Sequence, residues 1–492
     1  MKKTLSIILL LIMTATFIIS CSDDSTSDNT DITTTAAGEI NEEESALEAE
    51  ENKAPEQVDL EGFTLRILNQ TPESFSWANT LITAPELTGD VLTDAVYNRT
   101  ATVEQYFNAV IQETQIADVT GTLRTFTMAG EDAYDMVMLF NASNLTDAFV
   151  GGLLDSWDKL SYIRMDQPWW DADATKLYNF SNRQIALSGD FSLYDYSTRH
   201  CYVFNKDMYA ELNIADNLYQ VVNDGKWTVD KLYELGALAA MDIDGDGEFS
   251  AKTDRFGISG TITRHYSALL AGSNVRYVDR DSDGELFYAI PSSEYAFSVI
   301  QKLVELNLSN NIYNSGVNDI GGGDESIFRN GRTLFTAAYI NEAGKLRDMD
   351  YDIGIVPPPK YNENQDRYYS LVEGGALSVM PVTLSTDRYD SVGMLLDGFA
   401  YFSHRDVIPV YIDIIVKSKF TRDEESVDML NIIFTSATYD LGVGAWSSTF
   451  KNQYTQNIFL PRSTDVASLS DKITPNAEKA LNDFNEAVKN LG

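Results

Sequence analysis

Alternation between short apolar runs and helical segments is the feature that most constrains how this chain can fold. Leu65–Leu68 is predicted as the first strand, and Thr93 can cap a helix over Asp94–Phe107. Val110–Ile111 then resumes a strand, and Met136–Phe140 is a continuous apolar run of the kind found in buried parallel strands. Strands and helices at this spacing predict βαβ units and an open α/β sheet.

Residues 223–260 join a second predicted helix to a run of acidic residues. Thr228 can cap this helix, and Trp227 before the cap can pack on Leu232 inside it. The segment Asp242–Gly247 follows, with alternating carboxylates and a glycine at its sixth position, which matches the first half of a calcium-binding loop. The second half departs from the EF-hand pattern, because Thr253 stands where that pattern has a glutamate.

We expect this loop to hold a structural Ca²⁺, because hard oxygen ligands suit that ion. The expected ligands are the side chains of Asp242, Asp244 and Asp246, the backbone carbonyl of Glu248 and the carboxylate of Asp254. The alternative is a solvated acidic turn without metal.

A second loop, Asp279–Gly284, carries the same six-position pattern. Strand-like runs flank it at Arg276–Val278 and Leu286–Tyr288. Asp-Gly between two such runs favours a β-hairpin, a turn that needs no metal. We therefore predict a hairpin here, and the sequence leaves open whether it also binds a metal.

The N-terminus is expected to be a targeting segment. Residues 1–20 combine Lys2 and Lys3 with an apolar run that is short for a transmembrane helix, as in a signal peptide. Ile18-Ile19-Ser20-Cys21 resembles a bacterial lipobox, so we expect a lipoprotein with lipid on Cys21. Cys201 then has no disulfide partner and is expected to be a small buried apolar residue.

Residues 21–57 are predicted to be an acidic, disordered tether. They contain twelve acidic residues, one lysine and no aromatic residue. A segment with so little apolar surface and so much like charge does not form a packed core. We expect it to hold the folded body away from the membrane.

The charge of the body excludes some partners. Of the formal −38, the tether accounts for −11 and Lys2 and Lys3 for +2, so residues 58–492 carry −29. Nucleic acid is not an expected partner, because its recognition depends on neutralising phosphates, and neither is anionic lipid beyond the anchor. The three histidines lack zinc-ligand spacing, and no G-x-S-x-G elbow occurs.

An ordered set of short motifs resembles the extracellular solute-binding proteins (family 1) of bacterial sugar importers. The set comprises Pro168–Asp171, Ser188–Asp190, Tyr202–Asp207, Trp227–Thr228 with the acidic loop and Asp254–Ile258, Phe328–Arg332, Ile355–Pro359, Arg422–Ser426 and Tyr439–Leu441. The resemblance covers about residues 58–492, and it rests on the order of the motifs rather than on any one of them. Several relatives carry a calcium in the acidic loop.

The resemblance implies an α/β chain with the two-lobed, type II periplasmic-binding-protein fold. Each lobe would be an open sheet flanked by helices, with a helix-rich C-terminus past Leu384. The chain would cross between the lobes three times. We place 58–203 in lobe 1, 204–333 in lobe 2, 334–376 in lobe 1 again and 377–492 in lobe 2.

The function implied is that of a non-enzymatic, monomeric binding protein, anchored to the cell membrane by lipid on its extracytoplasmic side. Its partners would be a small-molecule ligand, expected to be an oligosaccharide, and the permease of an ABC transporter. By position in the family, the residues expected to line the ligand cleft are Phe75, Trp77, Asp190, His265, Tyr339, Glu373 and Trp446. Aromatic rings and planar polar groups are what a sugar site requires.

Two other functions remain open at this point. The first is an exported enzyme that acts on polysaccharide with a pair of carboxylates, which the abundance of acidic residues leaves possible. The second is a surface adhesion or sensory lipoprotein that serves no importer.

Overall fold

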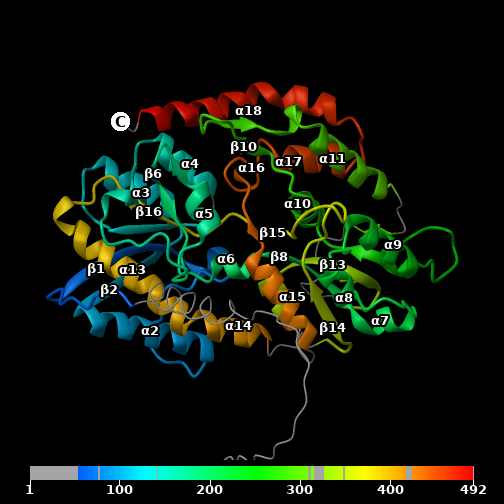
Figure 1. Cartoon of the computed structure of the whole chain (residues 1–492), viewed down its shortest axis with the longest axis horizontal. Coiled ribbons are helices and arrows are strands. Elements are labelled where there is room, and N and C mark those ends of the chain that lie inside the picture. Colours follow the sequence, from blue (N-terminus) through cyan, green and yellow to red (C-terminus); the bar gives the residue numbers. More distant parts are fainter. Residues whose placement is uncertain are drawn as a thin grey trace, which may run out of the picture. The chain divides into compact units, whose positions relative to one another are not determined.

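The protein is described here from a computed structural model, which covers residues 54–75, 78–140, 142–308, 312–314, 326–346, 349–416 and 424–490. The predicted signal peptide, Cys21, most of the tether and Trp77 lie outside these residues. Two mixed β-sheets, each flanked by helices, form the body (Figure 1). The predicted α/β class is therefore confirmed.

The first sheet has the strand order β2-β1-β3-β16-β4, with β7 beside β16. Its strands are β1 (Phe63–Gln70), β2 (Ala109–Ile116), β3 (Met136–Leu139), β4 (Leu154–Asp155), β7 (Ala186–Leu187) and β16 (Leu377–Pro381). β1 pairs in parallel with β2 and β3, as expected of βαβ units, and β16 is antiparallel to β3. Every residue of β3 is buried, as its continuous apolar sequence predicts.

Helices cover this sheet on both sides (Figure 1). They are α2 (Val91–Phe107) with α13 (Tyr389–Asp406), and α3 (Val119–Met128) with α4 (Ala142–Val150). α2 begins earlier than expected, because Asp90 rather than Thr93 is its N-cap. The Asp90 carboxylate accepts both the backbone N–H and the hydroxyl of Thr93, at 2.9 Å each, and a negative charge at a helix N-terminus is favourable.

The remaining short elements of the first half connect and border this sheet. They are η1 (Pro72–Phe75), η2 (Trp157–Lys159), α5 (Ala172–Leu177), β5 (Asn179–Phe180), β6 (Arg183–Gln184) and α6 (Tyr194–Ser197).

The second sheet has the strand order β12-β9-β13-β8-β14. Its strands are β8 (His200–Asn205), β9 (Phe256–Ser259), β12 (Tyr313–Asn314), β13 (Thr333–Tyr339) and β14 (Ile353–Val356). Every residue of β8, β9 and β13 is buried. Cys201 lies within β8, where burial raises the pKa of its thiol, which agrees with the expected buried apolar role.

Helices and a hairpin surround the second sheet. They are α7 (Lys206–Glu211), α8 (Leu218–Asn223), α9 (Val229–Ala239), α10 (Ile262–Gly272), β10 (Val278–Arg280), β11 (Leu286–Tyr288), η3 (Ile290–Ser292), α11 (Glu294–Leu306) and α12 (Ile340–Gly344). Thr228 caps α9 as predicted, accepting the N–H of Lys231 at 3.3 Å, and Trp227 and Leu232 are fully buried. The antiparallel pairing of β10 and β11 confirms the predicted hairpin.

The strand pairing corrects the expected lobe boundaries. We expected residues 334–376 in lobe 1, but β13 and β14 pair with β8 in the second sheet. The chain returns to the first sheet only at β16, which we expected to open the C-terminal part of lobe 2. β8 itself, whose first residues were assigned to lobe 1, lies wholly in the second sheet. Apolar runs of equal character suit either sheet, so the sequence does not distinguish them.

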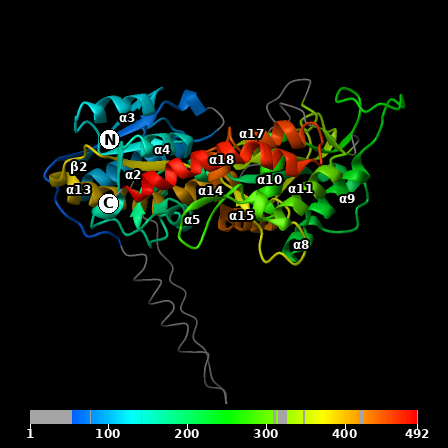
Figure 2. The same cartoon turned by 90° about the horizontal axis from the view of Figure 1, so that it is seen from above.

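The C-terminal part is mostly helical, as expected. Its elements, with the short pair β15–β17, are β15 (Ser370–Leu371), η4 (Thr386–Arg388), α14 (Ile408–Val416), α15 (Glu424–Thr435), β17 (Ala437–Thr438), α16 (Leu441–Gly444), α17 (Lys451–Tyr454), the π-helix η6 (Thr455–Phe459) and α18 (Val466–Lys489). α18 contacts both α4 of the first half and β11 of the second (Figures 1 and 2). Among the described helices, none is both long and apolar enough to cross a membrane.

Candidate functional site

Three chain segments run side by side between the two sheets, and the first two of them each link a strand of one sheet to a strand of the other. They are 198–199 before β8, 370–373 around β15, and 436–438 at β17. The N–H of Val372 donates to the carbonyl of Thr438 at 2.9 Å, and the N–H of Glu373 donates to the carbonyl of Thr198 at 3.4 Å. Backbone hydrogen bonds between these segments connect the two halves of the molecule. In proteins whose domains rotate about a hinge, a few residues of this kind absorb the change in backbone angles.

Glu373 forms the centre of a polar cluster beside these segments. Its Oε1 accepts a hydrogen bond from Lys451 Nζ at 2.5 Å, and its Oε2 lies 3.1 Å from His200 Nε2. Burial alone would raise the pKa of Glu373, but the Lys451 ammonium and the His200 hydrogen bond hold that pKa well below its usual value. Burial lowers the pKa of His200, and the hydrogen bond with Glu373 only partly offsets this.

Tyr339, the last residue of β13, extends this cluster toward α10. Its ring packs edge-on against the His200 ring, with the centroids 4.9 Å apart. The Arg264 guanidinium lies over the Tyr339 ring, 4.3 Å from its centroid, and Arg264 Nη2 also pairs with Glu342 Oε1 at 2.9 Å. Tyr339 and Glu373, two of the residues expected to bind ligand, are thus brought together through His200.

We refer to Glu373, His200, Lys451, Tyr339, Arg264 and Glu342 as the Glu373 cluster. Each of its two cations is paired with a carboxylate, which leaves no net charge if His200 is neutral. It combines an aromatic ring with buried, oriented donors and acceptors. Such a group can bind uncharged hydroxyl-bearing molecules without leaving a buried charge unpaired.

Asp190 lies elsewhere, on the first half of the molecule. Its carboxylate accepts hydrogen bonds from His404 Nδ1 at 2.5 Å and from the Tyr196 hydroxyl at 2.9 Å. Burial raises the pKa of Asp190, and the contact with Asp190 raises the pKa of His404. Asp190 lines a cavity of about 260 Å³ with Asp171 and Arg199, a cavity to which neither Glu373 nor Tyr339 contributes.

His265 is part of the second core, which corrects its expected place in a ligand cleft. The side chain is fully buried, and its ring stacks on Tyr313 with the centroids 4.3 Å apart. The hydroxyls of Tyr202 and Tyr233 lie 2.9 and 3.1 Å from its two ring nitrogens. Burial lowers the pKa of His265 to about 3, so the ring is neutral and both nitrogens are already occupied.

The remaining predicted ligand residues are Trp446, Phe75 and Trp77. Trp446 is partly buried and packs edge-on against Phe484 of α18, with the centroids 5.5 Å apart. Phe75 ends the short helix η1, and Trp77 lies outside the described residues. Of the six expected residues that the structure describes, Tyr339 and Glu373 are the two that join in the Glu373 cluster.

Four members of the Glu373 cluster were missed from the sequence: His200, Lys451, Arg264 and Glu342. His200 offered a weak signal, because it immediately precedes the apolar run of β8. Lys451 lies 78 residues beyond Glu373 in the chain, and no local pattern links them. Such pairings depend on the crossings between sheets, which a single sequence does not reveal.

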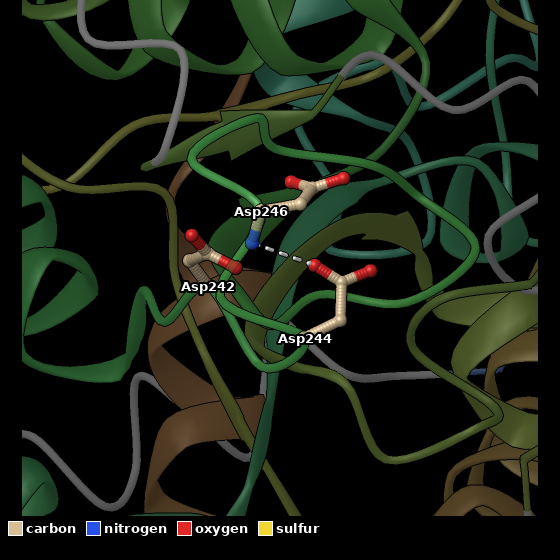
Figure 3. Close-up of side chains that lie close together, drawn as sticks. All are labelled: Asp242, Asp244 and Asp246. Atoms are coloured by element: carbon tan, nitrogen blue, oxygen red, sulfur yellow. Dashed lines mark hydrogen bonds between the residues drawn. The ribbon is translucent and has the colours of Figure 1, made fainter.

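The acidic loop gathers three carboxylates (Figure 3). One oxygen from each of Asp242, Asp244 and Asp246 lies within 4.8 Å of the others, which makes them a group that could hold a metal ion. The Asp242 carboxylate accepts the N–H groups of Gly245 and Gly247, at 2.7 and 2.9 Å. Both glycines have positive φ, +72° and +86°, which side chains rarely adopt.

Asp254 holds the two ends of this loop together. It is fully buried, and its two carboxylate oxygens accept the N–H of Ile243 at 2.8 Å and the N–H of Ser250 at 2.7 Å. The amide of Ser250, with smaller contributions from its other donors, lowers the pKa of Asp254. Asp254 thus ties the two ends of the loop together and is not a member of the three-carboxylate group.

Solved structures with the same fold are substrate-binding proteins of transporters and sugar-binding proteins. One is the ABC substrate-binding protein Lmo0181 from Listeria monocytogenes in complex with cycloalternan, which is 15% identical, has a TM-score of 0.50, and covers 87% of this chain and 98% of its own. Another is the cyclic alpha-maltosyl-1,6-maltose binding protein from Arthrobacter globiformis, at 13% identity, TM-score 0.55 and coverage of 87% and 100%. UspC from M. tuberculosis matches at 16% identity, TM-score 0.55 and coverage of 85% and 100%.

The chain thus has the two-lobed, periplasmic-binding-protein fold that the resemblance implied. At these identities the likeness establishes the fold alone. No family model matches the sequence, and no curated protein matches it.

Proposed function

We propose that this protein is a lipid-anchored, extracytoplasmic binding protein that captures a carbohydrate and delivers it to an ABC-type importer. The observation that carries the proposal is the architecture: two separate α/β sheets linked by two crossing segments, which pair with each other and with residues 436–438, and a polar and aromatic cluster beside them. Such an arrangement suits closure of two lobes on a solute by hinge bending. Release to a permease then requires only that the lobes reopen.

The Glu373 cluster supports a neutral, hydroxyl-rich ligand. Its Tyr339 ring can carry the C–H face of a sugar, while the Glu373 and Glu342 carboxylates and the Arg264 and Lys451 donors can share hydroxyl groups. The internal ion pairs mean that an uncharged ligand need not be accompanied by a counterion. The oligosaccharides named for two structural neighbours, cycloalternan and cyclic alpha-maltosyl-1,6-maltose, are of this chemical class.

We also propose that the acidic loop holds a structural Ca²⁺. Asp242, Asp244 and Asp246 would supply side-chain oxygens, and Glu248 its backbone carbonyl, as expected from the sequence. The gathered carboxylates and the two positive-φ glycines support this assignment. Asp254, expected as a further ligand, is better suited to hold the loop ends, because both of its oxygens already accept backbone amides.

A screen followed by calorimetry tests the carbohydrate proposal. The screen measures the melting temperature with oligosaccharides, peptides, amino acids and metal chelates. We expect oligosaccharides to raise it. Glu373→Gln and Tyr339→Ala should then weaken binding of the responding sugar about ten- to a hundredfold without unfolding the protein, since each removes a buried partner. Glu305→Ala, on an exposed position of α11, is the matched control and should bind normally.

Two results would contradict the proposal. A response to peptide or chelate with none to any sugar would remove the carbohydrate assignment while leaving a binding protein. Release of product from a bound glycan would replace the binding protein with the carboxylate-pair enzyme.

A further inference from the structure

A groove separate from the Glu373 cluster gathers three basic side chains. It has a volume of about 330 Å³ and lies between α5, the β10–β11 hairpin and the residues that follow β17. Lys176 comes from α5, while Arg276 and Arg280 come from the hairpin and its approach. None of the residues of the Glu373 cluster lines it. The volume lies within the range of small-molecule sites.

The three cations lack ion-pair partners, which is unusual in so acidic a body. Within the described part of the chain, no carboxylate lies within 4 Å of the charged nitrogens of Lys176, Arg276 or Arg280. Residues 58–492 carry −29 in total, so carboxylates to pair with these cations are not in short supply. Two acidic residues, Asp173 and Asp279, do line the groove, but both are exposed to solvent.

Arg280 is held in place by neutral groups. Its Nη2 donates to the carbonyl of Leu177 at 2.5 Å and its Nη1 to the carbonyl of Gly284 at 3.2 Å, while its guanidinium lies 4.4 Å from the centroid of the Phe180 ring. Burial lowers the pKa of Arg280, and Asp279 only partly offsets this. The positive charge is therefore oriented and only partly compensated, a state that a bound anion would relieve.

Arg276 is oriented in a similar way. Its Nη2 donates to the Thr438 hydroxyl at 3.2 Å, and its charge lowers the pKa of the buried Asp440, although burial keeps that pKa raised to about 6. Lys176 is exposed and free to move toward a bound molecule. Two fixed guanidinium groups and one mobile ammonium are a typical set of donors for an oxyanion.

We propose that this groove binds a small solute through an oxyanion, either a carboxylate or a phosphate, contacted by Lys176, Arg276 and Arg280. The apolar side chains of Leu286 and Leu441 form part of the lining. The groove has room for a solute the size of a sugar. Because the groove lies between α5 of the first half and the hairpin of the second, a bound anion would link the two halves. The site is independent of the carbohydrate proposal, since the two share no residue.

Isothermal titration calorimetry on the folded chain tests the site. The probes are inorganic phosphate, glucuronate, and glucose as the uncharged control, at a constant ionic strength of about 20 mM with chloride as the only other small anion. We expect saturable binding of phosphate, glucuronate or both, and none of glucose. A preference for phosphate identifies a free oxyanion as ligand, and a preference for glucuronate identifies an acidic sugar. Binding should weaken as salt screens the three charges.

Charge-removing variants decide whether the groove is responsible. Arg276→Gln should weaken the binding about tenfold, because it removes a fixed charge-assisted donor, and the mobile Lys176→Gln about threefold. Lys176 is exposed, so its variant keeps the test valid even if an arginine variant fails to fold. Lys479→Gln, which removes an exposed charge on α18, is the control and should bind as the unmodified protein does. Absence of saturable heat with both anions, or binding that Arg276→Gln and Lys176→Gln leave unchanged, would overturn the proposal.

Discussion

Two loops of this chain carry the same six-position acidic pattern and fold differently. In Asp242–Gly247 the three aspartates come together, with one oxygen of each within 4.8 Å of the others. In Asp279–Gly284 the first aspartate belongs to strand β10, opposite Phe287 of β11. Its third position, Asp281, accepts the N–H groups of Asp283 and Glu285, both at 2.9 Å. No second group of metal-ligand carboxylates occurs in the described ranges.

The difference arises from what flanks each pattern. β10 and β11 pair residue by residue, which holds Asp279 in an extended strand while Asp281 and Asp283 lie in the turn that follows. The first loop is closed by a single antiparallel bridge between Met241 and Arg255, and the buried Asp254 also draws its ends together through backbone amides. The acidic pattern alone therefore does not define a metal site. The flanking structure decides whether the carboxylates converge.

Calcium should produce the largest difference between the two loops. At free calcium a hundredfold above its Kd, binding to the folded state alone would add about 2.7 kcal/mol to the free energy of unfolding. Chelation should remove that stabilisation, and Asp246→Ala should abolish the sensitivity to chelator. Asp281→Ala in the hairpin is the matched control, and this variant should remain sensitive to the chelator. Urea unfolding with calcium and with chelator measures both. Coincident curves for the unmodified protein would leave the first loop a solvated acidic turn.

The loop glycines should give a smaller effect. Gly245 has φ of +72° and Gly284 has φ of +82°, and a Cβ at either position would meet open space, so only backbone strain opposes alanine. Gly245→Ala and Gly284→Ala should each lower the free energy of unfolding by about 1 kcal/mol. Only Gly245→Ala should also weaken calcium binding, as calorimetry can show. An equal loss of calcium affinity in both variants would mean that the hairpin also contributes to metal binding.

The smallest effect concerns Asp254 and pH. The pKa of Asp254 is lower in the folded state than in the unfolded state. Its carboxylate therefore contributes fully to the free energy of unfolding above the unfolded pKa of about 3.9, and this contribution is lost as the pH falls through the lower folded pKa. Asp254→Asn keeps one carbonyl acceptor, and it should flatten the fall of the melting temperature between about pH 5 and pH 2. Asp281→Asn is the control. A slope that Asp254→Asn leaves unchanged would contradict the role of Asp254 in closing the loop.

Local signals predicted much of the secondary structure because their causes lie within a few residues. The cap at Thr228 and the β10–β11 hairpin both depend on neighbours in sequence. Where two local signals competed, prediction was less accurate. Thr93 was a plausible cap, but the charged Asp90 three residues earlier is the better acceptor and begins the helix.

The candidate site was only partly predictable. Resemblance to a family placed Tyr339 and Glu373 near the crossings, and the structure brings them together around His200. The same reasoning placed His265 in a cleft, whereas it fills the core between Tyr202 and Tyr233. The sequence does not indicate whether a histidine that follows a buried strand faces the core or the solvent. Its packing partners decide this.

The sequence by itself determined the α/β class, the alternation of strands and helices, and the acidic loop with its glycines, because hydrophobic period and backbone preference are local properties. The tertiary structure decided which sheet received each strand. Residues 334–376 were expected with the first sheet, and β13 and β14 pair with β8 in the second. It also decided the partners of Glu373, since Lys451 contacts that carboxylate from a position 78 residues further along the chain. Pairing of this kind depends on contacts between distant segments, and buried strands of similar apolar sequence carry no local mark of their neighbours.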